Sequence, residues 1–311
     1  MNNQNIDVLV VEPTNECDLN CIYCPKREKR EMNIDFFRDI IVKNNCLEKR
    51  IPNIELGGMG NPLLHKNIKQ ILQLLKNNDL FCNILTNGLG LKDKVAFFDD
   101  DLLSKIHFSI YLDHPDEEKN DEIMGKKCYK KTIESFEYIK RRGIQFDIIM
   151  RIIPKNYDKI EDMLTIAKHY GANMLIPMEV FPFSDEKFIL TDETKRRVIE
   201  KINQLKNMGE PVHKTIHFEY PPGNCTYLRK KRLFISSSEE LGFCHFLSYL
   251  PANNKEKIKD KSFDEIIEFN NRIRDEFVKK KQNEINSWQL PRKTASPCSY
   301  CLQKIGYEKR W

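Results

Sequence analysis

The feature that most constrains the fold is a regular alternation of short apolar segments with helix-like segments along the first two thirds of the chain. The apolar, strand-like segments are residues 6–11, 51–56, 81–85, 106–112, 146–153 and 174–180. The helix-like segments that follow them are residues 35–45, 67–77, 92–101, 129–142, 160–170 and 191–207. Six β-α units in sequence predict a parallel sheet, because right-handed crossovers place the helices on its outer face. The pattern allows a partial TIM-like barrel or an open doubly wound sheet.

Three cysteines follow the first strand-like segment in a C-x3-C-x2-C pattern: Cys17, Cys21 and Cys24. Three thiolates on one loop can hold three corners of a cubane iron-sulfur cluster and leave the fourth iron open for another ligand. A zinc site is the alternative. Zinc sites are usually built from paired C-x2-C or histidine ligands, and His65 is the first histidine in the chain. The spacing therefore favours the iron-sulfur cluster.

Composition limits the compartment and the partners. The 311 residues include ten cysteines, and we find no apolar N-terminal signal segment and no apolar run long enough to cross a bilayer. The cysteines therefore predict a cytoplasmic protein that uses them for metal or redox chemistry. The net charge of +5 is small, and the basic clusters at residues 26–30 and 229–232 are short. We expect a monomer that binds neither nucleic acid nor membranes.

The cysteine loop resembles that of the radical S-adenosylmethionine (SAM) superfamily. It matches the family in spacing, in Asn20 before the second cysteine and in the aromatic Tyr23 before the third. The resemblance implies a partial (β/α)6 TIM-like barrel over residues 1–208, with Tyr23 at a cofactor site that holds a 4Fe-4S cluster and SAM. It also implies that SAM is cleaved to methionine and a 5′-deoxyadenosyl radical, which takes a hydrogen atom from the substrate.

A glycine-rich stretch follows the second strand-like segment and contains Gly57, Gly58 and Gly60. It resembles the motif of the superfamily in which exposed backbone groups meet the amino group of SAM, and glycine lets a backbone approach a ligand closely. An ordinary strand-to-helix turn is the alternative. Asn61 stands where the family usually has Glu. Its amide oxygen can accept a bond from the ammonium, but without a full charge.

Four polar residues lie on or after the later strand-like segments. Ser109 and Asp113 resemble the Ser-x-Asp-type segment that the family uses near the ribose and carboxylate of SAM, although Asp113 could equally cap a helix or a turn. Arg151 lies in an apolar run, where a charge is unusual unless it is paired or meets a ligand carboxylate, so we expect it to serve SAM or the substrate. Glu179 is also a charged residue in an apolar run, so we expect it to bind the cofactor. A salt bridge between Glu179 and Arg151 is the alternative.

Four more cysteines lie in the last third of the chain: Cys225, Cys244, Cys298 and Cys301. They resemble the ligands of the twitch domain, a shortened SPASM extension that holds an auxiliary 4Fe-4S cluster, which implies a small α+β domain over residues 209–311. A zinc ribbon is the alternative, but zinc usually joins two C-x2-C pairs and only one exists here. The elements predicted in this region are a hairpin from residues 232–236 and 241–244 and a helix over residues 262–280.

The resemblance implies that four cysteines saturate the auxiliary cluster, so electron transfer is its natural role. We therefore expect a two-electron oxidation of a small polar metabolite, as in the aminocyclitol dehydrogenase that resembles this architecture, with a flavodoxin- or ferredoxin-type electron donor. One alternative is an epimerase in which a thiol such as Cys128 returns a hydrogen atom, and another is a peptide-modifying maturase. A non-catalytic iron-sulfur or zinc protein is a remote alternative. Cys46, Cys82 and Cys128 are most simply small buried or semi-buried hydrophobic residues.

Overall fold

The computed structural model describes residues 6–25, 28–46, 51–96, 98–180, 185–213, 227, 229, 231–242, 244–245 and 256–286. Its strands are β1 (Val8–Val11), β2 (Asn53–Leu56), β3 (Phe81–Thr86), β4 (Ile106–Tyr111), β5 (Phe146–Ile152), β6 (Leu175–Glu179), β7 (Arg232–Ile235), β8 (Glu240–Gly242) and β9 (Glu256–Lys257). They form one sheet in the order β6-β5-β4-β3-β2-β1-β7-β8-β9. The strands from β6 to β7 pair in parallel, while β8 and β9 run antiparallel. Over the described residues the sheet is not closed, and the predicted partial barrel is confirmed.

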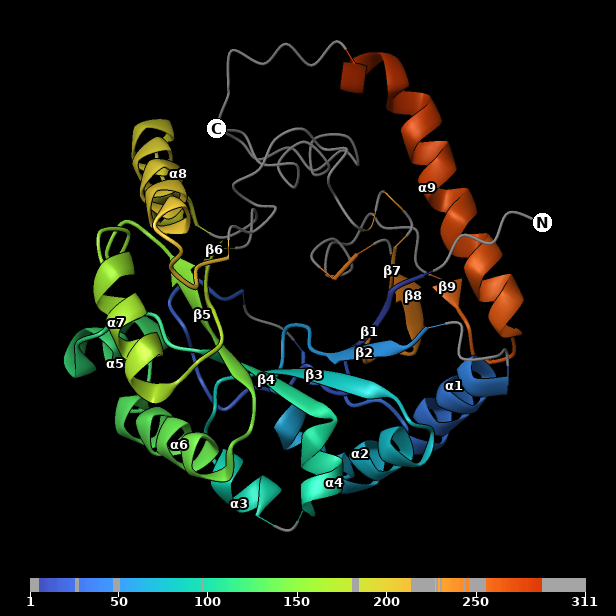
Figure 1. The fold of residues 1–311 in the computed structure, drawn as a ribbon. Helices are drawn as coiled ribbons and strands as arrows, with labels where there is room; N and C mark the ends of the chain where they lie inside the picture. Colours follow the sequence, from blue (N-terminus) through green and yellow to red (C-terminus); the bar gives the residue numbers. More distant parts are fainter. Residues whose placement is uncertain are drawn as a thin grey trace.

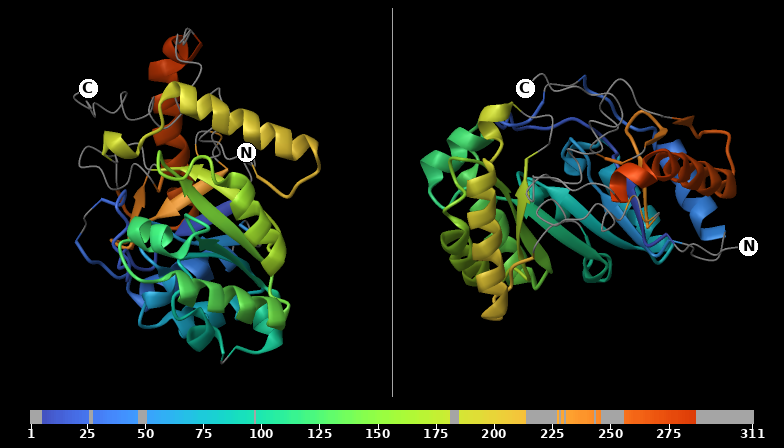
Figure 2. Two further views of the ribbon diagram at one scale, coloured as in Figure 1. Left: turned by 90° about the vertical axis from the view of Figure 1, so that its left-hand side faces the viewer. Right: turned by 90° about the horizontal axis from the view of Figure 1, so that it is seen from above.

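Helices cover the outer, convex side of the curved sheet (Figure 1). They are α1 (Ile34–Cys46), α2 (Ile68–Asn77), α3 (Leu91–Val95), α4 (Asp100–Ser104), α5 (Glu117–Met124), α6 (Tyr129–Arg142) and α7 (Ile160–Tyr170). Two longer helices lie at opposite ends of the sheet, α8 (Asp192–Asn207) after β6 and α9 (Phe263–Asn286) beside α1 (Figure 2). Among the described residues, none of these helices has the length and apolar character needed to cross a membrane.

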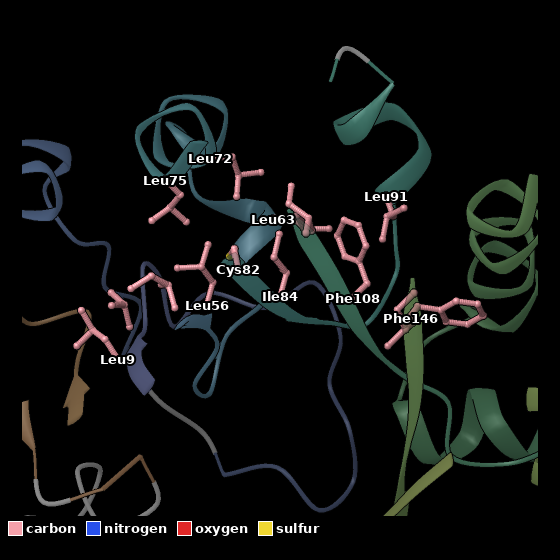
Figure 3. Close-up of a cluster of buried hydrophobic side chains, with 14 of the residues drawn as sticks. Leu9, Leu56, Leu63, Leu72, Leu75, Cys82, Ile84, Leu91, Phe108 and Phe146 are labelled. Carbon is pink, nitrogen blue, oxygen red and sulfur yellow. The ribbon is translucent and has the colours of Figure 1, made fainter. Parts of the chain in front are cut away.

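The core lies between the sheet and the outer helices. Leu9, Leu56, Ile84 and Phe108 project from neighbouring strands toward the helices, and each is no more than 1% exposed. They pack with side chains such as Leu72 of α2 (Figure 3). Alternate residues of a strand point to opposite faces, so these apolar positions fix which face of each strand is covered.

The inner face of the sheet is polar in comparison. Glu55 on β2 forms a two-pronged ion pair with Arg232 on β7, at 2.9 Å and 3.3 Å. On β4 and β5, His107 Nε2 lies 2.9 Å from Asp147 Oδ2. All four side chains are only partly buried. The inner face of the sheet therefore carries paired polar and charged side chains, whereas the outer face contributes the apolar residues of the core.

Two helices differ from the sequence prediction. The single helix expected over residues 92–101 is divided into α3 and α4, because the Asp99 side chain accepts from the backbone N–H of Leu102 and starts a new helix. Helix α5 was not predicted. It is short and largely polar, and it begins where the Asp116 side chain accepts from the Lys119 N–H.

The predicted C-terminal hairpin is β7 and β8, and the predicted helix is α9. Strand β7 pairs in parallel with β1, with Val8 opposite Arg232. At the other edge, Leu175 of β6 forms an isolated parallel bridge with Val212. The part of the chain after residue 208 thus contributes to both edges of the barrel sheet, and the domain boundary at residues 208/209 stays a prediction.

Candidate active site

A cavity lies where the loops after β1, β2 and β3 meet the ends of β4 and β5. Residues from all five of these regions line it: Cys17, Leu19, Cys21, Tyr23, Cys24, Gly58, Met59, Gly60, Asn61, Leu85, Thr86, Asn87, Tyr111, Met124 and Arg151. The carboxyl ends of parallel strands are the usual place for a binding site in this class of fold. The structure therefore brings the predicted cysteine triplet together with Arg151 and most of the glycine-rich stretch.

The cysteine loop has little regular structure, and α5 holds it in place. The backbone N–H groups of Asn20 and Ile22 donate to the carbonyls of Met124 and Ile123, at 3.2 Å and 3.0 Å. Its three cysteines are partly buried residues. Within the described residues, no three His, Cys, Asp or Glu side chains converge as one metal ion requires. Three thiols around one cavity instead suit a polynuclear cluster, in which each iron takes one thiolate.

The glycines after β2 allow close packing against the loop after β1. A Cβ atom on Gly60 would lie 2.3 Å from the carbonyl oxygen of Thr14, and one on Gly58 would lie 2.5 Å from Glu12 Oε1. Glu12 also accepts from the N–H of Met59 at 2.8 Å. A Cβ atom on Gly57 would meet the Leu85 side chain at 3.3 Å. The packing accounts for the glycines without a ligand, and their contact with SAM stays a prediction.

Asn61 lines the cavity and is only 2% exposed. Its amide oxygen accepts from Thr86 Oγ1 at 2.9 Å and from the N–H of Leu63 at 3.3 Å. Its amide nitrogen donates to Asn87 Oδ1 at 3.0 Å. A carbonyl oxygen has two lone pairs, so both acceptor positions of the Asn61 side chain are already in use. The predicted contact between this oxygen and the SAM ammonium stays a prediction. The ammonium would have to compete with Thr86 and Leu63 for the oxygen.

Asp113 is buried and joins two parts of the site, and its predicted contact with SAM stays a prediction. Its Oδ2 accepts from the Tyr23 hydroxyl at 2.6 Å, and its Oδ1 accepts from the backbone N–H of Arg151 at 2.8 Å. Burial raises the pKa of Asp113 to about 6, although both of these donors oppose the shift. Burial and the nearby Asp113 charge also raise the pKa of Tyr23. Tyr23 thereby ties the cysteine loop to the end of β4.

Arg151 and Glu179 lie close together but are not an ion pair. The guanidinium of Arg151 donates to the backbone carbonyl of Glu179 at 2.8 Å and lies over the ring of Tyr111 at 5.5 Å. The Glu179 carboxylate instead pairs with Lys195 of α8, at 2.9 Å and 3.0 Å. The alternative of a salt bridge between Glu179 and Arg151 is therefore wrong, because α8 supplies a buried lysine for that carboxylate.

Two other predicted residues, Ser109 and Cys128, are not among those that line the cavity. The hydroxyl of Ser109 donates to Asn83 Oδ1 at 3.1 Å on the inner face of the sheet. Cys128 precedes α6, is 2% exposed, and packs with Leu89 and Met124. Burial, followed by the charge of Asp121, raises the pKa of Cys128 to about 12, so the group is a thiol at neutral pH. The roles predicted for Ser109 and Cys128 stay predictions.

Two residues of the site, Asp18 and Asn87, are not predicted from the sequence. The amide nitrogen of Asn87 donates to Asp18 Oδ1 at 2.7 Å and lies 3.9 Å from the Cys17 sulfur. Only their positions in the sequence could have indicated them. Asp18 lies between two cysteines of the triplet, and Asn87 directly follows a parallel strand.

Of the second cysteine set, Cys244 lies just after β8 and is 9% exposed. Cys225, Cys298 and Cys301 lie outside the described residues. The second cluster site is thus represented in the described part of the chain by one ligand candidate. Of the three cysteines expected to be buried or semi-buried hydrophobic residues, Cys82 in β3 and Cys128 are buried as predicted, whereas the side chain of Cys46 is outside what the structure describes.

Three comparisons relate this geometry to known proteins. The chain is 28% identical over 269 residues to an uncharacterised protein of Methanocaldococcus jannaschii, covering 81% of this chain and 90% of that protein. It is 25% identical over 179 residues to the mycofactocin maturase MftC of Mycolicibacterium smegmatis, covering 54% of this chain but only 43% of the maturase. The structure of anSMEcpe with bound AdoMet and Cp18Cys peptide shares the fold, with a TM-score of 0.69, 13% identity and 96% coverage of both chains. A model of the radical SAM superfamily matches residues 11–167, just over half of the 311 residues, and the chain therefore belongs to this superfamily.

Proposed function

We propose that this radical SAM enzyme takes a hydrogen atom from a small polar metabolite and completes a two-electron oxidation through a second iron-sulfur cluster. The observation that carries the first half is the cavity that gathers Cys17, Cys21 and Cys24 with Arg151. A 4Fe-4S cluster that gives one electron to SAM would supply a 5′-deoxyadenosyl radical there. The three thiolates would hold the cluster and leave one iron for SAM.

The remaining residues of the cavity bind and orient. Arg151 offers a guanidinium to a carboxylate, and its position is fixed by the Glu179 carbonyl and the Tyr111 ring. Met59, Leu85 and Met124 give the wall an apolar surface. Such a surface excludes water from a reactive radical. Asp113 and Tyr23 hold the cysteine loop against β4.

The second half of the proposal rests on the later cysteines. Cys225, Cys244, Cys298 and Cys301 would hold an auxiliary 4Fe-4S cluster with no open corner. A substrate radical that loses a proton from its hydroxyl group would pass one electron to that cluster, so the substrate loses two hydrogens in total. Two features support this reading: Cys244 is buried, and β8 lies two strands from β1 in the same sheet.

Peptide modification is the second candidate. It is favoured by the likeness to the maturase MftC and by the peptide named in the anSMEcpe structure. The described strands form an open sheet with β6 and β9 at its edges, which would let an extended chain reach its inner face. The polar groups on its inner face, such as the Glu55–Arg232 pair, suit a polar metabolite equally well.

The test begins with anaerobic reconstitution and assay for 5′-deoxyadenosine, with a reduced flavodoxin or ferredoxin as electron donor. We expect about eight irons per chain from the two cysteine sets. Replacement of Cys17, Cys21 and Cys24 together by Ala should leave about four and abolish SAM cleavage. If the triple variant still formed 5′-deoxyadenosine, the assignment of this site would be wrong.

Reaction in heavy water then separates the possible outcomes. Oxidation gives a product two hydrogens lighter than the substrate, with no solvent deuterium at a stable carbon. Epimerisation through a thiol gives an isomer that carries one deuterium. A modified peptide substrate would favour the second candidate, whatever the label.

A further inference from the structure

We propose that Asp18 is the carboxylate that binds the amino group of SAM in this enzyme. The proposal rests on the SAM-dependent function proposed above and names a binding residue that neither the glycine-rich stretch nor Asn61 provides. SAM carries an ammonium group on its methionine part. A carboxylate hydrogen-bonded to such a group binds it more tightly than a neutral amide does, because the bond is charge-assisted.

In two other carboxylates beside the cavity, each oxygen already accepts a hydrogen bond from a protein donor. Glu12 accepts from the Met59 N–H with Oε1 and from the Ser237 N–H and hydroxyl with Oε2. Asp113 accepts from Arg151 and Tyr23 with its two oxygens. Both oxygens of each carboxylate are therefore already engaged by the protein.

Asp18 differs from both. Its Oδ1 accepts from the amide nitrogens of Asn87, at 2.7 Å, and Asn61, at 3.4 Å. Among the described residues, no donor is bonded to its Oδ2, and the side chain is only partly buried. One oxygen of Asp18 is thus not engaged by any described residue, whereas both oxygens of Glu12 and of Asp113 are.

The partners of Asp18 place it at the rim of the cavity. Asn61 and Asn87 both line the cavity, as do Cys17 and Leu19 on either side of Asp18 in the chain. The two amides donate to Asp18 Oδ1 and so restrict how its carboxylate can turn. Asn61 itself is neutral, and its oxygen is occupied by Thr86 and Leu63. The negative charge at this rim comes from the cysteine loop and not from the loop after β2.

The first experiment measures binding of SAM and of S-adenosylhomocysteine to the reconstituted protein by equilibrium dialysis. S-adenosylhomocysteine keeps the amino group and lacks the sulfonium. We expect Asp18→Asn to weaken both ligands by roughly tenfold or more, because one charge-assisted hydrogen bond is lost. Glu16→Gln is the matched control, since Glu16 lies on the same loop and pairs with the exposed Lys29. It should change neither affinity by more than about twofold.

A second variant pair tests whether the charge can be moved. Asn61→Glu alone places two carboxylates side by side, so the melting temperature of the apoprotein should fall. Combining it with Asp18→Asn should restore both the melting temperature and SAM binding. Iron content, measured on every variant, shows whether the cluster still forms.

Unchanged affinity for both ligands in Asp18→Asn, at wild-type iron content, would overturn the proposal. A loss of affinity for SAM alone would also overturn the proposal, because the carboxylate would then interact with the sulfonium and not with the amino group. Failure of the proposed function is distinguishable, since in that case the wild-type protein itself would not cleave SAM.

Discussion

The Tyr23 hydroxyl donates a 2.6 Å hydrogen bond to Oδ2 of Asp113 across 90 residues of sequence. This bond joins the loop of the three cysteines to the end of β4. The same carboxylate receives the backbone N–H of Arg151 on β5. One buried carboxyl group thus links the cysteine loop, β4 and β5. Its ionisation should therefore change the free energy of unfolding of the protein.

The first prediction concerns pH. Because burial raises the pKa of Asp113 to about 6, the native apoprotein holds this proton more tightly than the unfolded chain does. The stabilisation is complete below the ordinary aspartate pKa of about 4 and is lost as the pH rises through about 6. We expect up to about 3 kcal/mol of such loss in the wild type, and Asp113→Asn should not show it. Urea unfolding of both apoproteins between pH 4 and 7 measures the difference, and parallel pH curves would contradict the prediction.

A second prediction concerns the buried ion pair of α8. Lys195→Met should destabilise the protein by about 3–5 kcal/mol, because it leaves the Glu179 carboxylate buried without its partner. Arg197→Met is the matched control on the same helix. Arg197 pairs with Glu193, and both side chains are mostly exposed, so we expect an effect of at most about 1 kcal/mol. Denaturant unfolding at pH 7 compares the two variants. Equal losses of unfolding free energy would show that the buried ion pair stabilises the protein no more than the exposed pair does.

A third prediction separates packing from backbone strain at glycine. Gly60→Ala should lower the melting temperature strongly, because the new Cβ would meet the Thr14 carbonyl at 2.3 Å and neither backbone can easily move. Gly143→Ala is the comparison, since that glycine has φ +64° and open space around it. It should cost only the roughly 1–2 kcal/mol of a left-handed residue. Thermal unfolding of both apoproteins is sufficient, and a smaller loss in Gly60→Ala would refute the packing argument.

The fourth prediction concerns Cys128. With a pKa of about 12 and 2% exposure, its thiol should resist iodoacetamide at pH 8 in the native protein and react only after unfolding. Under the proposed oxidation, Cys128→Ala should leave both SAM cleavage and product formation intact. Loss of product with continued hydrogen abstraction would instead show that this thiol returns a hydrogen atom and that the enzyme is an epimerase.

The sequence predicts the repeating part of the fold well, because the apolar periodicity of the strands directly reflects which face is covered. The helices over residues 129–142 and 160–170 have the predicted bounds. Helix α5 has no such pattern, since only its Asn120, Ile123 and Met124 are buried. Its presence depends on the Asp116 cap and on contacts with the distant cysteine loop, which no local pattern reveals.

The site shows the same division. The spacing of Cys17, Cys21 and Cys24 is enough by itself to indicate that the three thiols share one function. The partner of Glu179 does not follow from sequence, because Lys195 lies on a helix whose orientation against β6 is set by the whole fold. Asp18 becomes a site candidate only because two side-chain amides from other loops donate hydrogen bonds to it, and the sequence does not reveal these bonds.

The pairing of β7 with β1 has a consequence for biosynthesis. Val8 and its neighbour Arg232 are separated by 224 positions, so this contact closes one of the longest loops in the chain. Contacts of high sequence separation form late. During translation, one edge of β1 stays without its neighbour until residues 232–235 have left the ribosome. The cysteine loop directly follows β1, so the chain presents its cluster ligands beside an unfinished sheet edge while most of the protein is being made.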